Sequence, residues 1–356
     1  MGWEEKYAMD DSPRQEHGPQ VASEAEERPT LKTIARMSGL AVPTVSRALN
    51  DAPDIGEDTK RRIKEIADRI GYRPNRAGVR LRTGRTNVIS LILSTESDMM
   101  NHTGRLISSV AAGLRGTPFH LNITPFFPSE DPMAPLRYIV ETASADGIIL
   151  NQIETHDQRV KYLMDRDFPF ATHGRTAWCD NHSYYDFDNT EFGRIALEAL
   201  VAKGRRRIKM LPPPRGQNYS ENMIAGAAEA ARRSGVEFAF FTETSADASS
   251  EEIESVASAC LSGANPPDGF IVPSAAASMA VVSAAEDLGL ELGHDFDLMS
   301  KEATPFLRRF RRNLLTVGED VRHAGTFLAQ AIIHRIHHRD EAPMQRLDRP
   351  EIGVGP

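Results

Sequence analysis

Apolar positions along this chain follow two different rhythms. Between residues 30 and 70 they recur every three or four positions, which predicts short amphipathic helices over about 31–37, 42–49 and 57–70. Thr30 is a suitable N-cap for the first helix, and Gly39 provides a turn before the second. Three short helices with a glycine turn between the first two are typical of a helix-turn-helix. On the third helix we expect a solvent-facing basic side made by Lys60, Arg61, Arg62 and Lys64.

From residue 87 onward, short apolar runs alternate with helix-like stretches. The runs, which suit buried parallel strands, are NVISLIL, HLNIT, GIILN, FPFAT, RIKML, EFAFF, GFIV, DLMSK and LLTV. This alternation predicts an α/β fold in which helices cover both faces of a parallel sheet. The segment is too long for one six-stranded sheet, so we expect two similar subdomains. Ligands bind such sheets at the carboxyl ends of the strands, and two facing subdomains therefore predict a ligand cleft there.

The charge of the chain is segregated. Residues 1–28 carry 3 Lys or Arg against 8 Asp or Glu, residues 29–86 carry 13 against 6, and the remaining residues carry 26 against 36. The commonest use of a compact basic block in a chain of net charge −8 is to neutralise phosphate. An ordinary solvated patch is the alternative. Residues 1–28 are polar and acidic, and we expect them to form a disordered tail.

Several protein classes are excluded by what the sequence lacks. It has no run of 18 apolar residues and no apolar core of a secretion signal near its start, so we expect a soluble, cytoplasmic protein with no membrane partner. Cys179 and Cys260 are too far apart for a metal knuckle, and nothing indicates a disulfide scaffold. The chain has no phosphate-binding glycine loop and no evident nucleophile with its base, so we expect neither an enzyme nor a cofactor.

Three late histidines have a spacing that can bind zinc. His334, His337 and His338 are predicted to lie near the end of one helix. No carboxylate-rich segment accompanies them, and histidines there also complement the helix dipole. We therefore expect no metal at these residues.

Two motifs carry a family resemblance. TVSRALN occupies positions 44–50 within TLKTIARMSGLAVPTVSRALN, and GYRPNRA occupies positions 71–77. Residues 30–86 closely resemble the DNA-binding headpiece of the lac-repressor (LacI/GalR) family, and the resemblance continues weakly through the rest of the chain. It implies a three-helix headpiece at 29–73, a hinge at 74–86 and a two-lobed, periplasmic-binding-protein-like parallel-sheet effector domain at 87–356. The expected first subdomain spans about 87–188 and 319–340, and the second spans about 189–318 and 341–356.

The resemblance places the second helix in the major groove of DNA. It implies that Val42 and Pro43 take the variable base-reading positions, where they can offer only apolar contacts, and that Arg47 reads a guanine. The alternative for the short polar residues of this helix is that they merely solvate it. Ala41 departs from the serine N-cap usual in the family, at a cost of about 1 kcal/mol of helix stability. The expected DNA-binding set is Thr33, Val42, Pro43, Thr44, Ser46, Arg47, Asn50, Tyr72, Asn75, Arg76 and Leu81.

The segment PNRAGVRL at 74–81 matches the hinge of the family. In relatives this hinge becomes helical only on operator DNA, and a leucine wedges into a minor-groove step. Leu81 is the implied wedge. Gly78 costs about 1 kcal/mol in a helix interior, which favours the alternative of a flexible basic linker.

The family binds a small molecule, usually a sugar or sugar derivative, between its subdomains. Two departures bear on that ligand: Met223 stands where relatives carry an arginine, and Glu302 alone fills an acidic motif in SKEA. The alternative is that the polar candidates cap helices or solvate loops. The expected effector-binding set, placed at or beyond strand ends, is Met100, Asn101, Asn151, His173, Arg175, Phe187, Asp188, Met223, Ser274 and Glu302.

These observations predict a transcriptional regulator that binds palindromic double-stranded operator DNA as a homodimer or tetramer. The expected role is repression of carbohydrate uptake or catabolism genes, with release by a sugar-like effector. One alternative is a corepressor-dependent regulator that binds a non-sugar metabolite. A two-lobed sugar-binding protein of transport systems is the alternative from another class, but it should lack a headpiece and carry an export signal.

Overall fold

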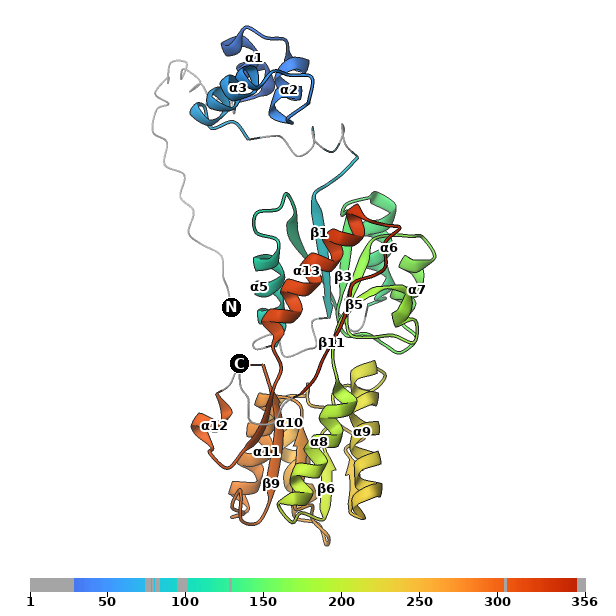
Figure 1. Ribbon diagram of the computed structural model, residues 1–356. Helices are drawn as coiled ribbons and strands as arrows, with labels where there is room; N and C mark the ends of the chain where they lie inside the picture. Colours follow the sequence, from blue (N-terminus) through green and yellow to red (C-terminus); the bar gives the residue numbers. More distant parts are fainter. Residues whose placement is uncertain are drawn as a thin grey trace, which may run out of the picture. The chain divides into compact units, whose positions relative to one another are not determined.

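The computed structural model describes residues 29–73, 78, 80, 84–94, 102–127, 130–303 and 306–350. The chain divides into two compact units at Thr83 and Gly84 (Figure 1). We call them the small unit and the large unit.

The small unit contains the three predicted helices, α1 (Leu31–Ser38), α2 (Val42–Leu49) and α3 (Glu57–Arg69). Thr30 caps α1 in a reciprocal capping box with Thr33, and Gly39 ends α1 in the left-handed conformation at φ 73°. The helices meet over one small core formed by Ile34, Val45, Ala48, Ile63, Ile66 and Ala67.

The prediction of a solvent-facing basic side on α3 was wrong for one residue, Lys60. Lys60 is buried, with 7% of its surface exposed, and its ammonium group donates to Glu57 Oε1 at 2.7 Å. A lysine can bury its aliphatic stem while its charged end reaches a partner, and Glu57 lies one turn away.

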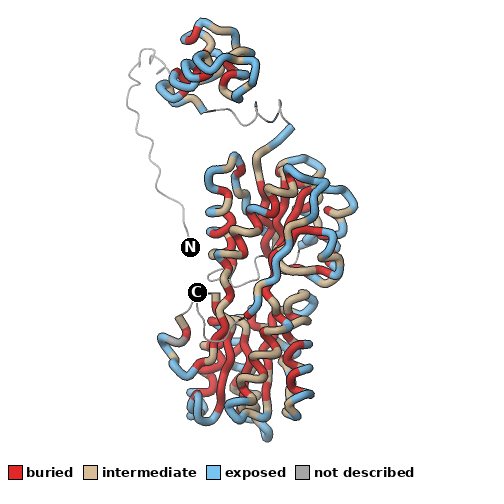
Figure 2. The backbone as a smooth tube through the Cα atoms, in the orientation of Figure 1, coloured by how far each residue is buried: buried red, intermediate tan, exposed pale blue. Residues whose placement is uncertain are grey.

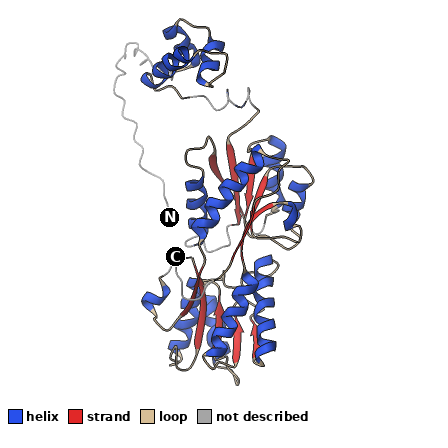
Figure 3. Ribbon diagram, viewed as in Figure 1, coloured by secondary structure: helices blue, strands red, loops and turns tan. Residues whose placement is uncertain are grey.

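The large unit contains two parallel sheets with helices on both faces, as the sequence predicts (Figure 3). The first sheet has the order β11-β5-β4-β3-β1-β2 and the second has the order β10-β9-β8-β6-β7. The strands of the first sheet are β1 (Val88–Ser94), β2 (His120–Phe126), β3 (Gly147–Leu150), β4 (Phe170–His173), β5 (Ser183–Phe187) and β11 (Gln345–Asp348). Those of the second are β6 (Arg207–Met210), β7 (Glu237–Phe240), β8 (Gly269–Val272), β9 (Asp297–Glu302) and β10 (Leu315–Gly318).

Each sheet is buried on both faces because alternate side chains enter different cores. Along β1, Leu91 packs with the helices on one face and Ile92 packs with those on the other. Figure 2 shows the resulting buried centre of each lobe. The helices around the first sheet are α5 (Gly104–Gly113), α6 (Met133–Thr142), α7 (Gln158–Met164) and α13 (Val321–His337). Those around the second are α8 (Asn189–Ala202), α9 (Asn218–Ser234), α10 (Ser250–Leu261), α11 (Ala275–Asp287) and the short α12 (Leu307–Phe310), and a 3₁₀ turn η2 (Cys179–Asn181) precedes β5.

Glycines allow two helix pairs to approach closely. A Cβ added at Gly226 of α9 would collide with the backbone oxygen of Thr190 in α8, and one at Gly193 would meet the backbone of Met223. In the first lobe, Gly325 of α13 packs against Ser109 of α5 in the same way. No helix in the described part of the chain is long and apolar enough to cross a membrane.

Strands β5 and β11 were not predicted, and the end of the chain was therefore assigned to the wrong lobe. Residues beyond 341 were expected in the second lobe, but β11 pairs in parallel with β5 at the edge of the first sheet. The physical reason is the polar character of this edge strand, whose residues are mostly exposed and do not form an apolar run.

Candidate functional site

The small unit presents the predicted side chains of α2 on its surface. Pro43, Arg47 and Asn50 are exposed. The other predicted DNA-binding residues of this helix, Val42, Thr44 and Ser46, are partly exposed. Val45 and Ala48 are buried instead, so one face of α2 packs on the core while the other stays available. The helix has no side-chain cap at Ala41, as the sequence indicates.

Arg47 is held by a carboxylate in this structure. Its guanidinium group pairs with Asp54, in the loop between α2 and α3, and 58% of the arginine side chain remains exposed. Because exposed ion pairs contribute at most about 1 kcal/mol, a stronger partner can displace Asp54. A guanine edge or a phosphate is such a partner for an arginine.

The remaining predicted DNA-binding residues are not on α2. Thr33 takes part in the capping box of α1, so its hydroxyl already has a structural role. Tyr72 packs against the small core, and burial raises the pKa of its hydroxyl. Asn75, Arg76 and Leu81 lie outside the described residues.

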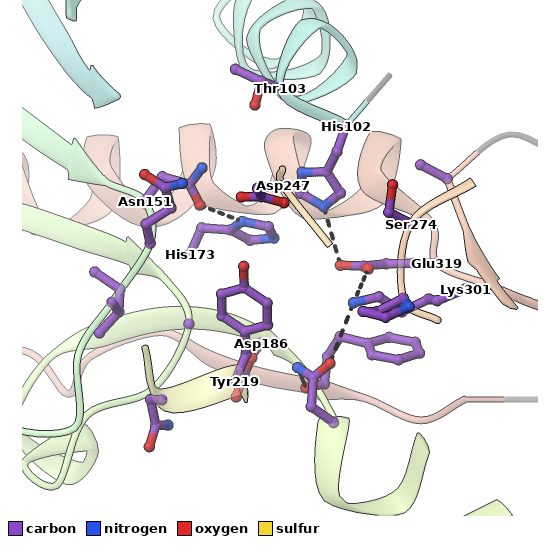
Figure 4. Close-up of a pocket in the computed structure, with 18 of the residues that line it drawn as sticks. His102, Thr103, Asn151, His173, Asp186, Tyr219, Asp247, Ser274, Lys301 and Glu319 are labelled. Atoms are coloured by element: carbon purple, nitrogen blue, oxygen red, sulfur yellow. Dashed lines mark hydrogen bonds and ion pairs between the residues drawn. The ribbon is translucent and has the colours of Figure 1, made fainter. Parts of the chain in front are cut away.

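The large unit contains a cavity at the carboxyl ends of the strands of both sheets (Figure 4). Its volume is about 1020 Å³ when the solvent-open mouth is counted. Its walls come from the ends of β3, β4 and β5 in one lobe and of β8, β9 and β10 in the other. The lining residues that carry the argument below are His102, Asn151, His173, Asp186, Phe187, Asn189, Asn218, Tyr219, Asp247, Ser274, Lys301 and Glu319.

Four of the predicted effector residues line this cavity. Asn151 and His173 face each other, with His173 Nδ1 at 3.0 Å from Asn151 Oδ1. Phe187 contributes an aromatic face, and Ser274 lies at the start of α11, where its hydroxyl also accepts from Ala277 N.

Four other predicted residues do not line the cavity. Arg175 lies behind it and donates from Nε to Asp186 Oδ2 at 2.7 Å. Asp188 caps α8, and Glu302 accepts from two backbone N–H groups at the start of α12, so both carboxylates serve helix ends. Met223 is fully buried in the core between α8 and α9. Met100 and Asn101 lie outside the described residues.

Sequence reasoning missed the charged centre of the cavity. Lys301 Nζ lies 2.8 Å from Glu319 Oε2 and 3.3 Å from Asn189 Oδ1, and it sits 5.0 Å from the ring centre of Phe187. Lys301 directly precedes the predicted residue Glu302 on β9. Because alternate residues of a strand point to opposite faces, one of the two had to face away from the cavity.

Burial shifts the pKa values of several groups in the cavity. It lowers the pKa of His173 to about 3, with the neighbouring His102 acting in the same direction. It raises the pKa of Asp186 to about 6, although Arg175 opposes that shift. Burial alone would also raise the pKa of Glu319, but Lys301 and His102 hold it well below its ordinary value. At neutral pH the cavity therefore contains a neutral His173 and an ionised Glu319.

Comparisons with known proteins agree with this arrangement. Residues 30–75 match the family model "Bacterial regulatory proteins, lacI family", and residues 197–355 match "Periplasmic binding protein-like domain". The chain is 28% identical over 332 residues to the HTH-type transcriptional regulator AglR of Rhizobium meliloti (strain 1021), covering 91% of this chain and 92% of that protein. It is 21% identical over 304 residues to the ribose operon repressor of Lactococcus lactis subsp. lactis (strain IL1403), covering 85% and 90% of the two chains.

Two solved structures share the fold. A lac repressor dimer bound to operator and the anti-inducer ONPF aligns with a TM-score of 0.79 at 17% identity, covering 92% of this chain and 98% of that chain. A transcriptional regulator CelR–cellobiose complex aligns with a TM-score of 0.66 at 20% identity, covering 92% and 99%.

The fold and the site define a class: a helix-turn-helix unit followed by a two-lobed ligand-binding body of the periplasmic-binding-protein type. Within that class, residues 30–75 match the lacI family of bacterial regulatory proteins, and the chain is similar over 91% of its length to a transcriptional regulator.

Proposed function

We propose that this chain is a homodimeric repressor that binds a palindromic operator and is released by an uncharged sugar or polyol. The observation that carries the proposal is the combination of an exposed basic helix-turn-helix with a partly open cavity whose lining includes amide, hydroxyl and aromatic side chains. Two-fold proteins read two-fold sites, which is why a dimer and a palindrome are proposed together.

The cavity has the chemistry that a sugar requires. Sugar rings pack an apolar face on aromatic side chains, and Phe187 and Tyr219 offer such faces. Hydroxyls need groups that both donate and accept, which the amides of Asn151 and Asn218 contain; the amide of Asn189 already donates to Phe187 O and accepts from Lys301. The relatives include a regulator solved with cellobiose and a ribose operon repressor, which supports a carbohydrate effector here.

The charges of the cavity favour an uncharged ligand over a sugar acid or sugar phosphate. Among the described lining residues, Lys301 is the lone lysine or arginine, and Glu319 accepts from it at 2.8 Å. Asp186 and Asp247 add further carboxylates. The stretches 95–101 and 304–305, which adjoin lining residues in sequence, contain no lysine or arginine. An anionic ligand would thus meet like charge without a spare cation.

The DNA part of the proposal is tested with the purified full-length chain and sheared genomic DNA. We expect it to retain a few fragments that carry an inverted repeat and to elute as a dimer. A monomer without preference for any fragment, in the presence or absence of cell extract, would contradict the proposal.

The effector part is tested by gel shift with a retained fragment and matched ligands. Cellobiose and cellobionate form one pair, and ribose and ribose 5-phosphate form another. We expect release by uncharged members of a wider sugar panel and none by their charged counterparts. Tighter DNA binding with ligand would instead indicate a corepressor.

A further inference from the structure

Three side chains with metal-binding atoms converge in the cavity of the large unit. They are His102, which precedes α5, His173, which ends β4, and Glu319, which follows β10 (Figure 4). One ligand atom of each lies within 4.8 Å of the other two, and His102 Nε2 lies 3.4 Å from Glu319 Oε1. Two ligands of a tetrahedral ion with bonds of about 2.1 Å lie about 3.4 Å apart, so this pair already has a suitable separation.

Two of the three candidate ligands are oriented by a second group. Asn151 Oδ1 lies 3.0 Å from His173 Nδ1, and with this oxygen accepting the Nδ1 proton, the Nε2 lone pair is free to bind a metal. Lys301 occupies Glu319 Oε2 at 2.8 Å and leaves Oε1 on the side of His102. Such outer partners are a regular feature of metal sites because they fix the ligand and its protonation state.

The electrostatic surroundings also suit a cation. Glu319, Asp186 and Asp247 all line the cavity; Lys301 pairs with Glu319, and Arg175 pairs with Asp186. Lys301 opposes the ion by charge but does not occupy the oxygen atom that would bind it.

We propose that His102, His173 and Glu319 bind one divalent transition-metal ion, with Zn²⁺ as the expected ion. Two imidazole nitrogens and one carboxylate oxygen favour Zn²⁺ over Mg²⁺ or Ca²⁺, which prefer all-oxygen sites. Three protein ligands leave coordination positions open toward the cavity for water or for adjacent hydroxyls of a polyol. This site goes beyond the proposed function and does not depend on it.

The test uses the full-length chain after treatment with a chelator. Calorimetric titration with Zn²⁺ should show one ion bound per chain, and Co²⁺ should give visible d–d absorption typical of nitrogen and oxygen ligands. We expect His102→Ala and His173→Ala each to weaken Zn²⁺ binding by more than 100-fold. Asn151→Ala, which removes only the orienting amide, should weaken it by about 10–100-fold.

A matched control removes histidines elsewhere. His334 and His338 flank Glu341 outside the cavity, with contacts of 3.0 and 3.1 Å. The double variant His334→Ala/His338→Ala should keep the cavity site and the Co²⁺ spectrum.

Two results would overturn the proposal: no Zn²⁺ binding by the wild-type chain, or binding that survives in His102→Ala and His173→Ala. Thermal melting and circular dichroism of each variant establish that it is folded. If a cavity variant fails to fold, the Co²⁺ spectrum of the wild-type chain still decides, since a purely oxygen-ligated spectrum contradicts the assignment.

Discussion

The small and large units keep their candidate functional residues in opposite places. In the small unit Pro43, Arg47 and Asn50 are exposed on one short helix and its C-cap, close together in sequence. In the large unit Lys301 and Glu319 are almost fully buried, and the other cavity residues come from segments far apart in the chain. A surface that meets a long polyanion can be built from one helix, whereas a cavity that encloses a small molecule needs many strand ends.

This difference decided what the sequence could predict. The helices of the small unit, the cap at Thr30 and the turn at Gly39 all follow from local periodicity, because the small core forms within one continuous segment. Nine strands of the large unit were predicted from their apolar runs. Strands β5 and β11 were not, because β11 is a polar edge strand and β5 contains polar and aromatic residues.

The cavity was predicted in position but only partly in composition. A cleft at strand ends follows from the fold class, and Asn151, His173, Phe187 and Ser274 line it. Glu302 was chosen because it stands at the acidic position of the family motif, and sequence alone does not fix which face of β9 meets the cavity. The salt bridge between Lys301 and Glu319 joins the ends of two strands and has no signature in either segment.

The largest expected effect comes from removing one core side chain from each unit, which tests whether the two units fold independently. Ile63→Ala should cost about 2–5 kcal/mol, which is comparable to the whole stability of a unit as small as this one. Hydrogen exchange should then lose protection across residues 31–69 while residues 88–337 keep theirs.

The matched change in the large unit is Ile332→Ala, since both isoleucines are 0% exposed. It should leave the large unit folded because that core is much larger. Loss of protection in both units after either substitution would show that they do not fold independently.

A second change tests the close helix contact of the large unit. Gly226→Ala places a methyl group against the Thr190 carbonyl and should destabilise the large unit by about 1–3 kcal/mol. Urea unfolding followed by the fluorescence of Trp178 measures this loss. Ala225→Ser, at an exposed position of the same helix, is the control. Equal stability of both variants would argue against the contact.

A third change addresses the surface of the small unit. Arg47→Ala should lose about 1–3 kcal/mol of preference for operator over scrambled DNA, because it removes the proposed guanine contact. Arg61→Ala removes another exposed charge, from α3, and should weaken binding to both duplexes alike. Fluorescence anisotropy measures both. An Arg47→Ala chain with undiminished operator preference would remove Arg47 from base recognition.

The smallest expected effect is an increase in the stability of the small unit alone. Ala41→Ser supplies the missing cap of α2 and should stabilise the small unit by about 1 kcal/mol. Its thermal transition should move upward while that of the large unit stays in place. An unchanged transition of the small unit would mean that the serine hydroxyl does not reach the helix N–H groups.

The most direct test of the account is operator release measured in one cavity variant. An uncharged sugar that releases the wild-type chain should weaken its operator affinity by about 5–150-fold. Phe187→Ala should bind the same operator as tightly as wild type without sugar but should no longer respond to the sugar concentration that releases wild type. Equal release of both chains by that concentration would contradict the assignment of sensing to this cavity.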